Sequence, residues 1–177
     1  MICPDIPPLI SVIIPVFNQQ KFLTKCLDSI LHQSFRDIEI IVVDDGSTDK
    51  TVQTVNNYIN NDQRIHLQSQ ENRGAGSARN HGLQLARGRY IHFLDSDDWL
   101  EENAYTQLAE QVIQQQNIDL LLFQYNEVDF YSNVITEVDL FPLTETEKLL
   151  EDCTSHRQIL LETAVVPWNK LISREFL

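Results

Sequence analysis

The stretch LISVIIPVFN, residues 9–18, decides how this chain folds. Residues 9–16 are almost continuously apolar and rich in β-branched side chains, a pattern typical of a strand that is buried on both faces. The apolar run ends at Pro15 and Asn18. The stretch therefore predicts a central parallel strand that leads directly into a polar loop.

Strand and helix patterns alternate outward from this strand. After it, apolar residues recur at helical spacing, and further β-branched runs follow. The predicted elements are a helix over 19–33, a strand over 38–43, a helix after a Ser47 cap that carries Val52, Val55 and Ile59, a short strand over 65–68, a helix over 77–86, a strand over 90–94, a helix over 101–116 and a strand over 120–125. This alternation predicts an α/β fold with a Rossmann-like, mostly parallel central sheet and helices on both faces.

The pattern loosens toward the C-terminus. Residues 130–143 mix aromatic, acidic and β-branched side chains, which favours an antiparallel excursion. Two short helices are expected over 144–152 and 157–163. The 177 residues suffice for one well-packed domain, so we expect a single domain, 1–177, with a small mixed C-terminal portion.

Composition narrows the possible partners. The formal net charge of −13 and the pI near 4.6 disfavour nucleic acid and anionic lipid surfaces. A small anionic ligand could still bind if a divalent cation stood between its phosphates and the protein's carboxylates. The three widely spaced cysteines, and the absence of a leader or membrane span in the sequence, predict a cytoplasmic protein; peripheral association with the inner face of the membrane stays open.

Polar segments follow four predicted strands in turn. They are PVFN (15–18), DDGS (44–47), GAGSARN (74–80) and DSDD (95–98). In a doubly wound sheet the ligand lies beyond the carboxyl ends of the strands. These segments are therefore expected to converge on one binding site.

Asp95 and Asp97 are candidate metal ligands. One residue separates them, so in an extended segment both carboxylates leave on the same side and can reach one hard cation. The alternative is a turn in which Asp97 or Asp98 caps the next helix. The sequence lacks an EF-hand, a P-loop and the third glycine of a dinucleotide fingerprint after Gly74, so NAD is not expected.

The DDGS segment has two interpretations as well. One carboxylate could accept a hydrogen bond from a base N–H, which would select uracil or thymine. The segment could instead be a strand-to-helix turn, with Gly46 supplying a permissive backbone and Ser47 capping the helix. Arg73 and Arg79 are candidates to meet phosphate, or to pair with surface carboxylates.

These motifs together resemble a known family. SVIIPVFN (11–18), VVDDGSTD (42–49), NRG (72–74), ARN (78–80) and FLDSDD (93–98), in this order and spacing, resemble the family 2 glycosyltransferases of the GT-A fold, in particular those that build bacterial cell-surface glycans. The resemblance is strong over residues 9–103, and PWNKL (167–171) adds a shorter match. For that last segment, a buried tryptophan at a packing corner is the alternative.

The resemblance implies a nucleotide-diphospho-sugar donor, with UDP as the expected carrier and dTDP or GDP still open. Implied nucleotide-binding residues are Pro15, Val16 and Asn18 around the base, Asp45 on uracil, Asp95 on the ribose or the metal, and also Arg79 and Ser96; Asp44 is expected to be structural. Asp97 and Asp95 would form a DXD motif that binds Mn²⁺ or Mg²⁺. The cation would let an acidic protein hold a diphosphate.

The resemblance further implies inverting transfer to a glycan or lipid-linked acceptor. Residues 9–103 would bind the donor and 104–177 would begin the acceptor side. The family's general base is expected beyond Leu177, so we expect this chain to bind donor but to transfer sugar poorly. The alternatives are a non-catalytic nucleotide-sugar-binding module, a sugar-nucleotidyltransferase, and a phosphoacceptor receiver domain.

Overall fold

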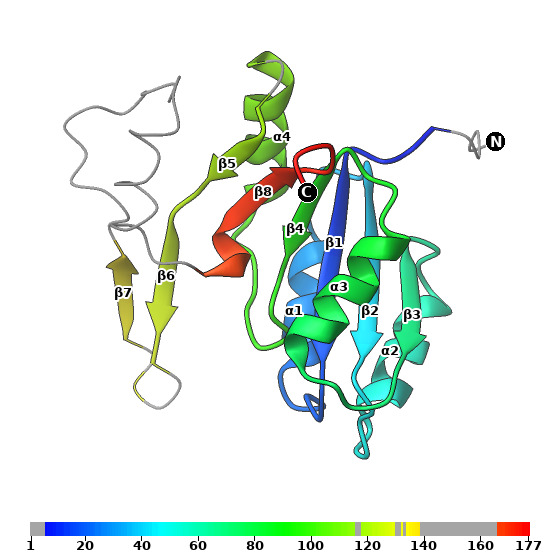
Figure 1. Ribbon diagram of the computed structural model, residues 1–177. Helices are drawn as coiled ribbons and strands as arrows, with labels where there is room; N and C mark the ends of the chain where they lie inside the picture. The colour runs from blue at the N-terminus through cyan, green and yellow to red at the C-terminus, as the bar shows by residue number, and fades with distance from the viewer. Residues whose placement is uncertain (1–5, 116–117, 130–131, 133, 139–165) are drawn as a thin grey trace.

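A computed structural model describes residues 6–115, 118–129, 132, 134–138 and 166–177 (Figure 1). Its elements are β1 (Ile10–Val16), α1 (Leu23–Leu31), β2 (Ile38–Asp44), α2 (Thr51–Ile59), β3 (Ile65–Ser69), α3 (Ala75–Leu85), β4 (Tyr90–Phe93), α4 (Ala104–Gln114), β5 (Leu120–Leu122), β6 (Tyr125–Val128), β7 (Ile135–Val138), the 3₁₀ helix η1 (Pro167–Asn169) and β8 (Lys170–Ser173). The two helices expected over 144–152 and 157–163 lie outside the described residues. No described helix is long and apolar enough to cross a membrane.

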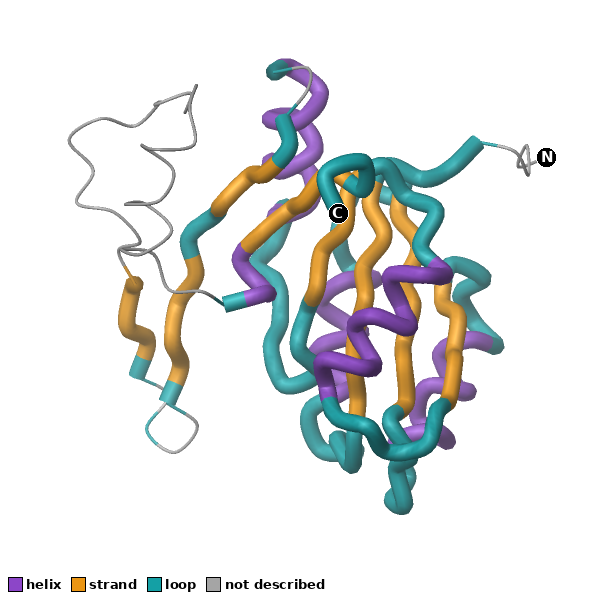
Figure 2. The backbone as a smooth tube through the Cα atoms, viewed as in Figure 1, coloured by secondary structure: helices purple, strands orange, loops and turns teal. Residues whose placement is uncertain are grey.

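The central sheet has the order β3-β2-β1-β4-β8-β5. Strands β1 to β4 pair in parallel, while β8 runs antiparallel to both β4 and β5. Figure 2 shows the strands in orange, lying side by side. Strands β6 and β7 form a separate antiparallel pair. The predicted mostly parallel sheet with a mixed C-terminal portion is therefore confirmed.

Alternate residues of β1 supply two cores, one on each face of the sheet. Ile10, Val12 and Ile14 are buried in one cluster with residues of α1 and α4. Ile13 belongs to a second cluster, which it shares with Ala78 of α3. Figure 1 shows α3 on the opposite face of the sheet from α1 and α2, which confirms the prediction of helices on both faces.

Helix α3 packs directly against β1 and β2 at Gly82. A Cβ atom added at Gly82 would come within 2.4 Å of Cγ2 of Ile13 and 3.3 Å of Cγ2 of Val43. Glycine is therefore required here for close helix–strand packing. This approach brings the N-terminal turn of α3 to the carboxyl ends of β1 and β2.

Several predicted local features are wrong in detail. Ser47 does not cap α2, which begins at Thr51, where the Asp49 carboxylate accepts the Thr51 backbone N–H at 2.9 Å. Ser47 Oγ instead accepts the backbone N–H of Asn18 at 2.9 Å. The single strand expected over 120–125 is divided between β5 and β6, and the antiparallel excursion begins at Tyr125 rather than at residue 130.

The PWNKL segment enters the main sheet. After η1, β8 pairs with β4 through Tyr90↔Ser173 and Ile91↔Ile172. The residue buried here is Asn169, at 1% exposure, whereas Trp168 is half-buried. The alternative of a buried tryptophan at a packing corner is therefore wrong.

A buried histidine of β4 ties this segment to α4. His92 of β4 is 0% exposed, and its Nε2 lies 2.8 Å from the Trp168 carbonyl, which can only accept. Nδ1 of the neutral ring therefore accepts from the Tyr105 hydroxyl at 2.8 Å. Burial lowers the pKa of His92 to about 4, so the ring is neutral near pH 7.

Candidate active site

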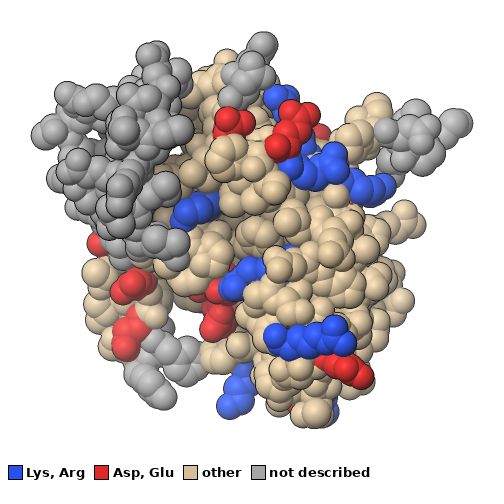
Figure 3. Space-filling model, in the orientation of Figure 1, with Lys and Arg blue, Asp and Glu red and all other residues tan. Residues whose placement is uncertain are grey.

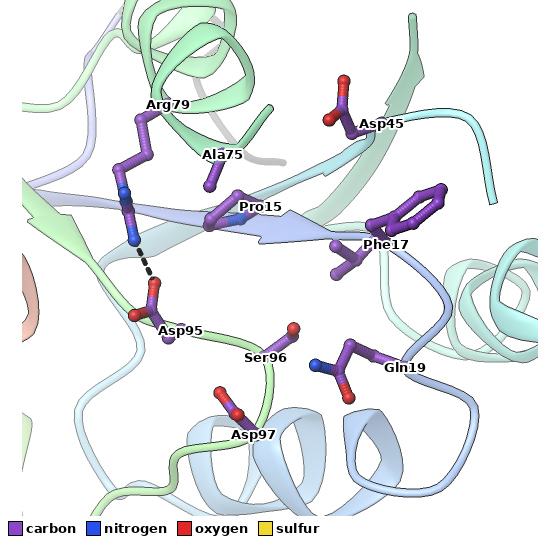
Figure 4. Close-up of a pocket in the computed structure, with 10 residues that line it drawn as sticks. Pro15, Phe17, Gln19, Asp45, Ala75, Arg79, Asp95, Ser96 and Asp97 are labelled. Atoms are coloured by element: carbon purple, nitrogen blue, oxygen red, sulfur yellow. Dashed lines mark hydrogen bonds and ion pairs between the residues drawn. The ribbon is translucent and has the colours of Figure 1, made fainter. Parts of the chain in front are cut away.

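The candidate site is a cavity of about 200 Å³ at the carboxyl ends of β1, β2 and β4 (Figure 4). The first turns of α3 complete its wall. Its lining residues are Pro15, Val16, Phe17, Gln19, Asp45, Ala75, Arg79, Asp95, Ser96 and Asp97. The convergence expected from parallel strands that end at the same edge is present.

Most of the candidate residues line this cavity, but Asn18 and Arg73 do not. Asn18 lies beside it in a left-handed conformation with φ 55°, and its Oδ1 accepts the Thr48 backbone N–H at 2.8 Å. Asn18 thus holds the loop after β2 against the loop after β1. Phe17 and Ala75 also line the cavity; they lie within the segments 15–18 and 74–80 but were not singled out from the sequence. Gln19, directly after the first of these segments, was missed.

The carboxylate of Asp45 is buried and surrounded by donors. Its Oδ1 accepts from Gln70 Nε2 and the Arg73 backbone N–H, both at 2.8 Å, and its Oδ2 accepts the Gly74 backbone N–H at 2.7 Å. Burial raises the pKa of Asp45, but the hydrogen bonds from Arg73, Gln70 and Gly74 outweigh it and hold the pKa below its usual value. Asp45 is therefore an ionised acceptor near pH 7.

Arg79 reaches from α3 across the end of β1 to Asp95, as Figure 4 shows. Its Nη2 lies 2.5 Å from Oδ1 of Asp95, with both side chains about four-fifths buried. Its Nε is buried without a hydrogen-bond partner among the described residues. A buried N–H group without an acceptor is costly. This Nε–H of Arg79 therefore suits an anionic ligand that would accept its hydrogen bond. Arg73 instead points away to Glu71, at 3.5 Å and largely exposed.

Three carboxylates crowd the loop after β4. Asp97 is exposed on the cavity wall, while Asp98 is partly buried and does not line the cavity. Burial, together with the charges of Asp97 and Asp95, raises the pKa of Asp98 to about 6. Burial and the same three aspartates raise the pKa of Cys26, whose thiol faces the Asp95 carbonyl at 3.7 Å. The loop therefore concentrates negative charge that a cation would relieve.

The residues of this loop fit a divalent cation that the protein would share with the phosphates of a ligand. Carboxylate oxygens such as those of Asp95 and Asp97 are the ligands that Mg²⁺ and Mn²⁺ prefer. The part of the chain that the structure describes holds no group of three or more His, Cys, Asp or Glu side chains placed to bind a metal. Mg²⁺ commonly takes only one or two carboxylates from a protein and completes its shell with substrate phosphates and water. The acidic pair fits that arrangement.

The net charge of −13 is not spread uniformly over the surface. On the face shown in Figure 3, small groups of basic side chains lie between acidic and uncharged areas. This face is therefore mixed in sign, unlike the extended basic surface typical of nucleic-acid-binding proteins.

The mostly parallel sheet with helices on both faces defines an α/β domain of the GT-A class, with a cavity at the carboxyl ends of its strands. The sequence model described as Glycosyl transferase family 2 matches residues 11–176. The chain therefore belongs to glycosyl transferase family 2, and the resemblance stated from the motifs is confirmed.

Relatives and solved structures agree with this assignment. Glycosyltransferase GlyA of Streptococcus pneumoniae serotype 4 is 34% identical over 92% of this chain, which spans 24% of GlyA. The structure of S. aureus TarS 1–349 in complex with UDP-GlcNAc superposes with a TM-score of 0.73 at 30% identity, over 93% of this chain and 45% of the TarS 1–349 chain. A Pyrobaculum calidifontis mannosyltransferase, PcManGT, in complex with GDP-Man and Mn²⁺ gives a TM-score of 0.58 at 25% identity, over 66% of this chain and 35% of the PcManGT chain.

Proposed function

We propose that this chain binds a UDP-sugar together with Mn²⁺ or Mg²⁺ and serves transfer of the sugar to a glycan or lipid-linked acceptor. The observation that carries the proposal is the convergence of Asp45, Arg79 and the Asp95–Asp97 pair on one cavity. It is supported by the UDP-GlcNAc in the S. aureus TarS structure and by the GDP-Man and Mn²⁺ in that of PcManGT. The chain spans less than half of either protein, so the acceptor is part of the proposal.

The base lies at the Asp45 end of the cavity in this proposal. Asp45 has donors on both oxygens and accepts the remaining N–H from uracil. Pro15 and Val16 supply the apolar wall for the ring, and Asp95 and Ser96 face the ribose. A buried, ionised acceptor discriminates strongly among bases, because a base without the matching N–H leaves the carboxylate unpaired.

The diphosphate lies at the other end, where Asp97 and Asp95 hold the cation and Arg79 offers its unpartnered Nε. When bound, the cation supplies neutralisation of the charge that develops on the leaving diphosphate. Family membership supports inverting transfer, in which the acceptor oxygen bonds to the anomeric carbon as the bond to the diphosphate breaks. The proton of the acceptor hydroxyl passes to a base that we do not assign.

Calorimetric titration with UDP tests the proposal. We expect wild-type binding to require Mn²⁺, and Asp97→Asn to weaken it by at least about tenfold, since hydrogen-bonded and ionic contacts to charged groups contribute about 1.5–3 kcal/mol each. Asp119→Asn is the matched control, because it removes the same charge from an exposed position that does not line the cavity. UDP affinity that is unchanged by both Mn²⁺ and Asp97→Asn would refute the metal role; no binding of UDP, dTDP or GDP under any metal condition would refute the donor site.

A further inference from the structure

We infer that Gln70 is a positioning residue that sets the base preference of this cavity by fixing the Asp45 carboxylate. The inference rests on the proposed function, because it concerns how the donor's base is selected. Gln70 is absent from the lining of the cavity, so it acts through Asp45 and not by contact with the base.

The side chain of Gln70 is held in one orientation. Its amide Nε2 donates to Asp45 Oδ1 at 2.8 Å and to Ser77 Oγ at 3.2 Å. Its Oε1 lies 3.0 Å from Nδ1 of His81, and because a carbonyl oxygen only accepts, Nδ1 carries the hydrogen. Its backbone N–H donates to the Asp44 carbonyl at 2.9 Å. Turning the amide over would place its oxygen against Asp45 and its nitrogen against the His81 N–H.

The shell around Asp45 is specific for a carboxylate. Two of its three donors are the backbone N–H groups of Arg73 and Gly74, which cannot become acceptors, and they approach different oxygens. An asparagine at position 45 would have to turn an N–H toward one of them. Three donors also occupy three of the roughly four acceptor positions of a carboxylate. A single acceptor position is left for a ligand.

A carboxylate fixed in this way accepts a donor from one position on the edge of a base. Uracil offers its N3–H, whereas N3 of cytosine carries no hydrogen and the amino donor of cytosine lies at the adjacent position. Without Gln70, the Arg73 and Gly74 N–H groups still hold one oxygen each, but Oδ1 of Asp45 gains a free acceptor position that the amino group of cytosine can use. Loss of Gln70 should therefore weaken discrimination between UDP and CDP.

The test measures the dissociation constants of UDP and CDP in the presence of Mn²⁺ for the 177-residue chain and its variants. We expect wild type to favour UDP by at least about tenfold, and Gln70→Leu to reduce that ratio by about tenfold, in line with loss of one hydrogen bond to a charged group. Gln70→Glu, which is close in size, should lose more UDP affinity because it sets a second carboxylate against Asp45. Gln68→Leu is the matched control, since Gln68 is exposed on β3 and does not line the cavity.

The ratio of the two affinities separates positioning from general damage, because a loosened fold lowers both affinities together. A UDP-to-CDP ratio that is unchanged in both Gln70 variants, with UDP still bound by wild type, overturns this inference and leaves the proposed function intact. Failure of wild type to bind either nucleotide overturns both. A changed ratio in Gln68→Leu of the same size overturns the assignment to Gln70.

Discussion

Replacing Glu39 tests the buried polar network that joins β1, β2 and the end of α3. Glu39 is 4% exposed, and its Oε1 accepts from the Ser11 hydroxyl at 2.6 Å and the Arg87 backbone N–H at 2.7 Å. Its Oε2 accepts from the Arg87 guanidinium, with the Nη2 atom 3.0 Å away. The Gly88 N–H reaches both Glu39 and Ser11, so it keeps a partner if Glu39 is lost.

The two replacements Glu39→Ala and Glu39→Gln should differ in cost. Alanine leaves the Ser11 hydroxyl and the Arg87 N–H without their acceptor, at about 1–3 kcal/mol each. Glu39 and Arg87 line a surface hollow, and water that enters from it limits the total to about 2–4 kcal/mol. Glutamine retains one oxygen for both buried donors, but its NH2 group cannot accept from the Arg87 guanidinium, so it loses the ion pair and the guanidinium turns to solvent. Because the Arg87 side chain is 60% exposed, that loss should be at most about 1 kcal/mol.

Urea unfolding followed by the fluorescence of the two tryptophans measures these differences. Exposed Glu110→Gln on α4 is the control and should match wild type. Burial raises the pKa of Glu39, but the hydrogen bonds from Ser11 and Arg87 lower it below 4.5 overall, so its stabilising effect is present above pH 4.5 and is lost as the pH falls through the lowered pKa. Equal destabilisation by glutamine and alanine, or an alanine variant as stable as wild type, would refute the reasoning.

Two further predictions concern the packing of α3 and the buried histidine. Gly82→Ala should destabilise the domain by about 1–3 kcal/mol, because its Cβ would meet Ile13 at 2.4 Å. Urea unfolding measures this loss, with Gly76→Ala as control because a Cβ at Gly76 has open space. Equal stability of the two variants would contradict the prediction. His92 has a pKa near 4 in the folded chain and 6.5 when unfolded, so its contribution is complete above pH 6.5 and falls by up to about 1.4 kcal/mol per pH unit toward pH 4. The free energy of unfolding, measured between pH 7 and 4, should fall less steeply with decreasing pH in His92→Gln than in wild type. Replacement of the exposed His66 by glutamine is the control. Equal slopes in His92→Gln and wild type would rule out this role for His92.

The alternation of strands and helices from β1 to β4 was predictable because each element carries its own pattern. Continuous apolar runs mark β1 and β2, which are buried along their whole length. Apolar residues at helical spacing mark α1, whose buried residues include Cys26 and Leu27. These patterns report burial directly, and burial is what selects the element. Parallel pairing then places the strand ends together, which made most of the cavity predictable.

The helix starts and the C-terminal strands were not predictable in the same way. Ser47 has the residue type of a cap, yet its hydroxyl bonds Asn18, which is 29 residues away in sequence. Strand β8 has only four residues, too few for an alternation of apolar and polar side chains to be recognised. It is a strand because it pairs with β4 on one side and with β5 on the other. In both cases a contact between distant segments outweighs the local preference.

The sequence by itself determined the class of fold, the family, and the identity of the carboxylates at the strand ends, because hydrophobic periodicity and short motifs are local properties of the chain. Only the tertiary structure decided what each of these groups bonds. Arg79 pairs with Asp95, and Gln70 with Asp45, although 16 and 25 residues separate the partners in sequence. The sheet brings the partners of each pair together, and a hydrogen bond forms only between groups that the fold has placed within about 3 Å of each other.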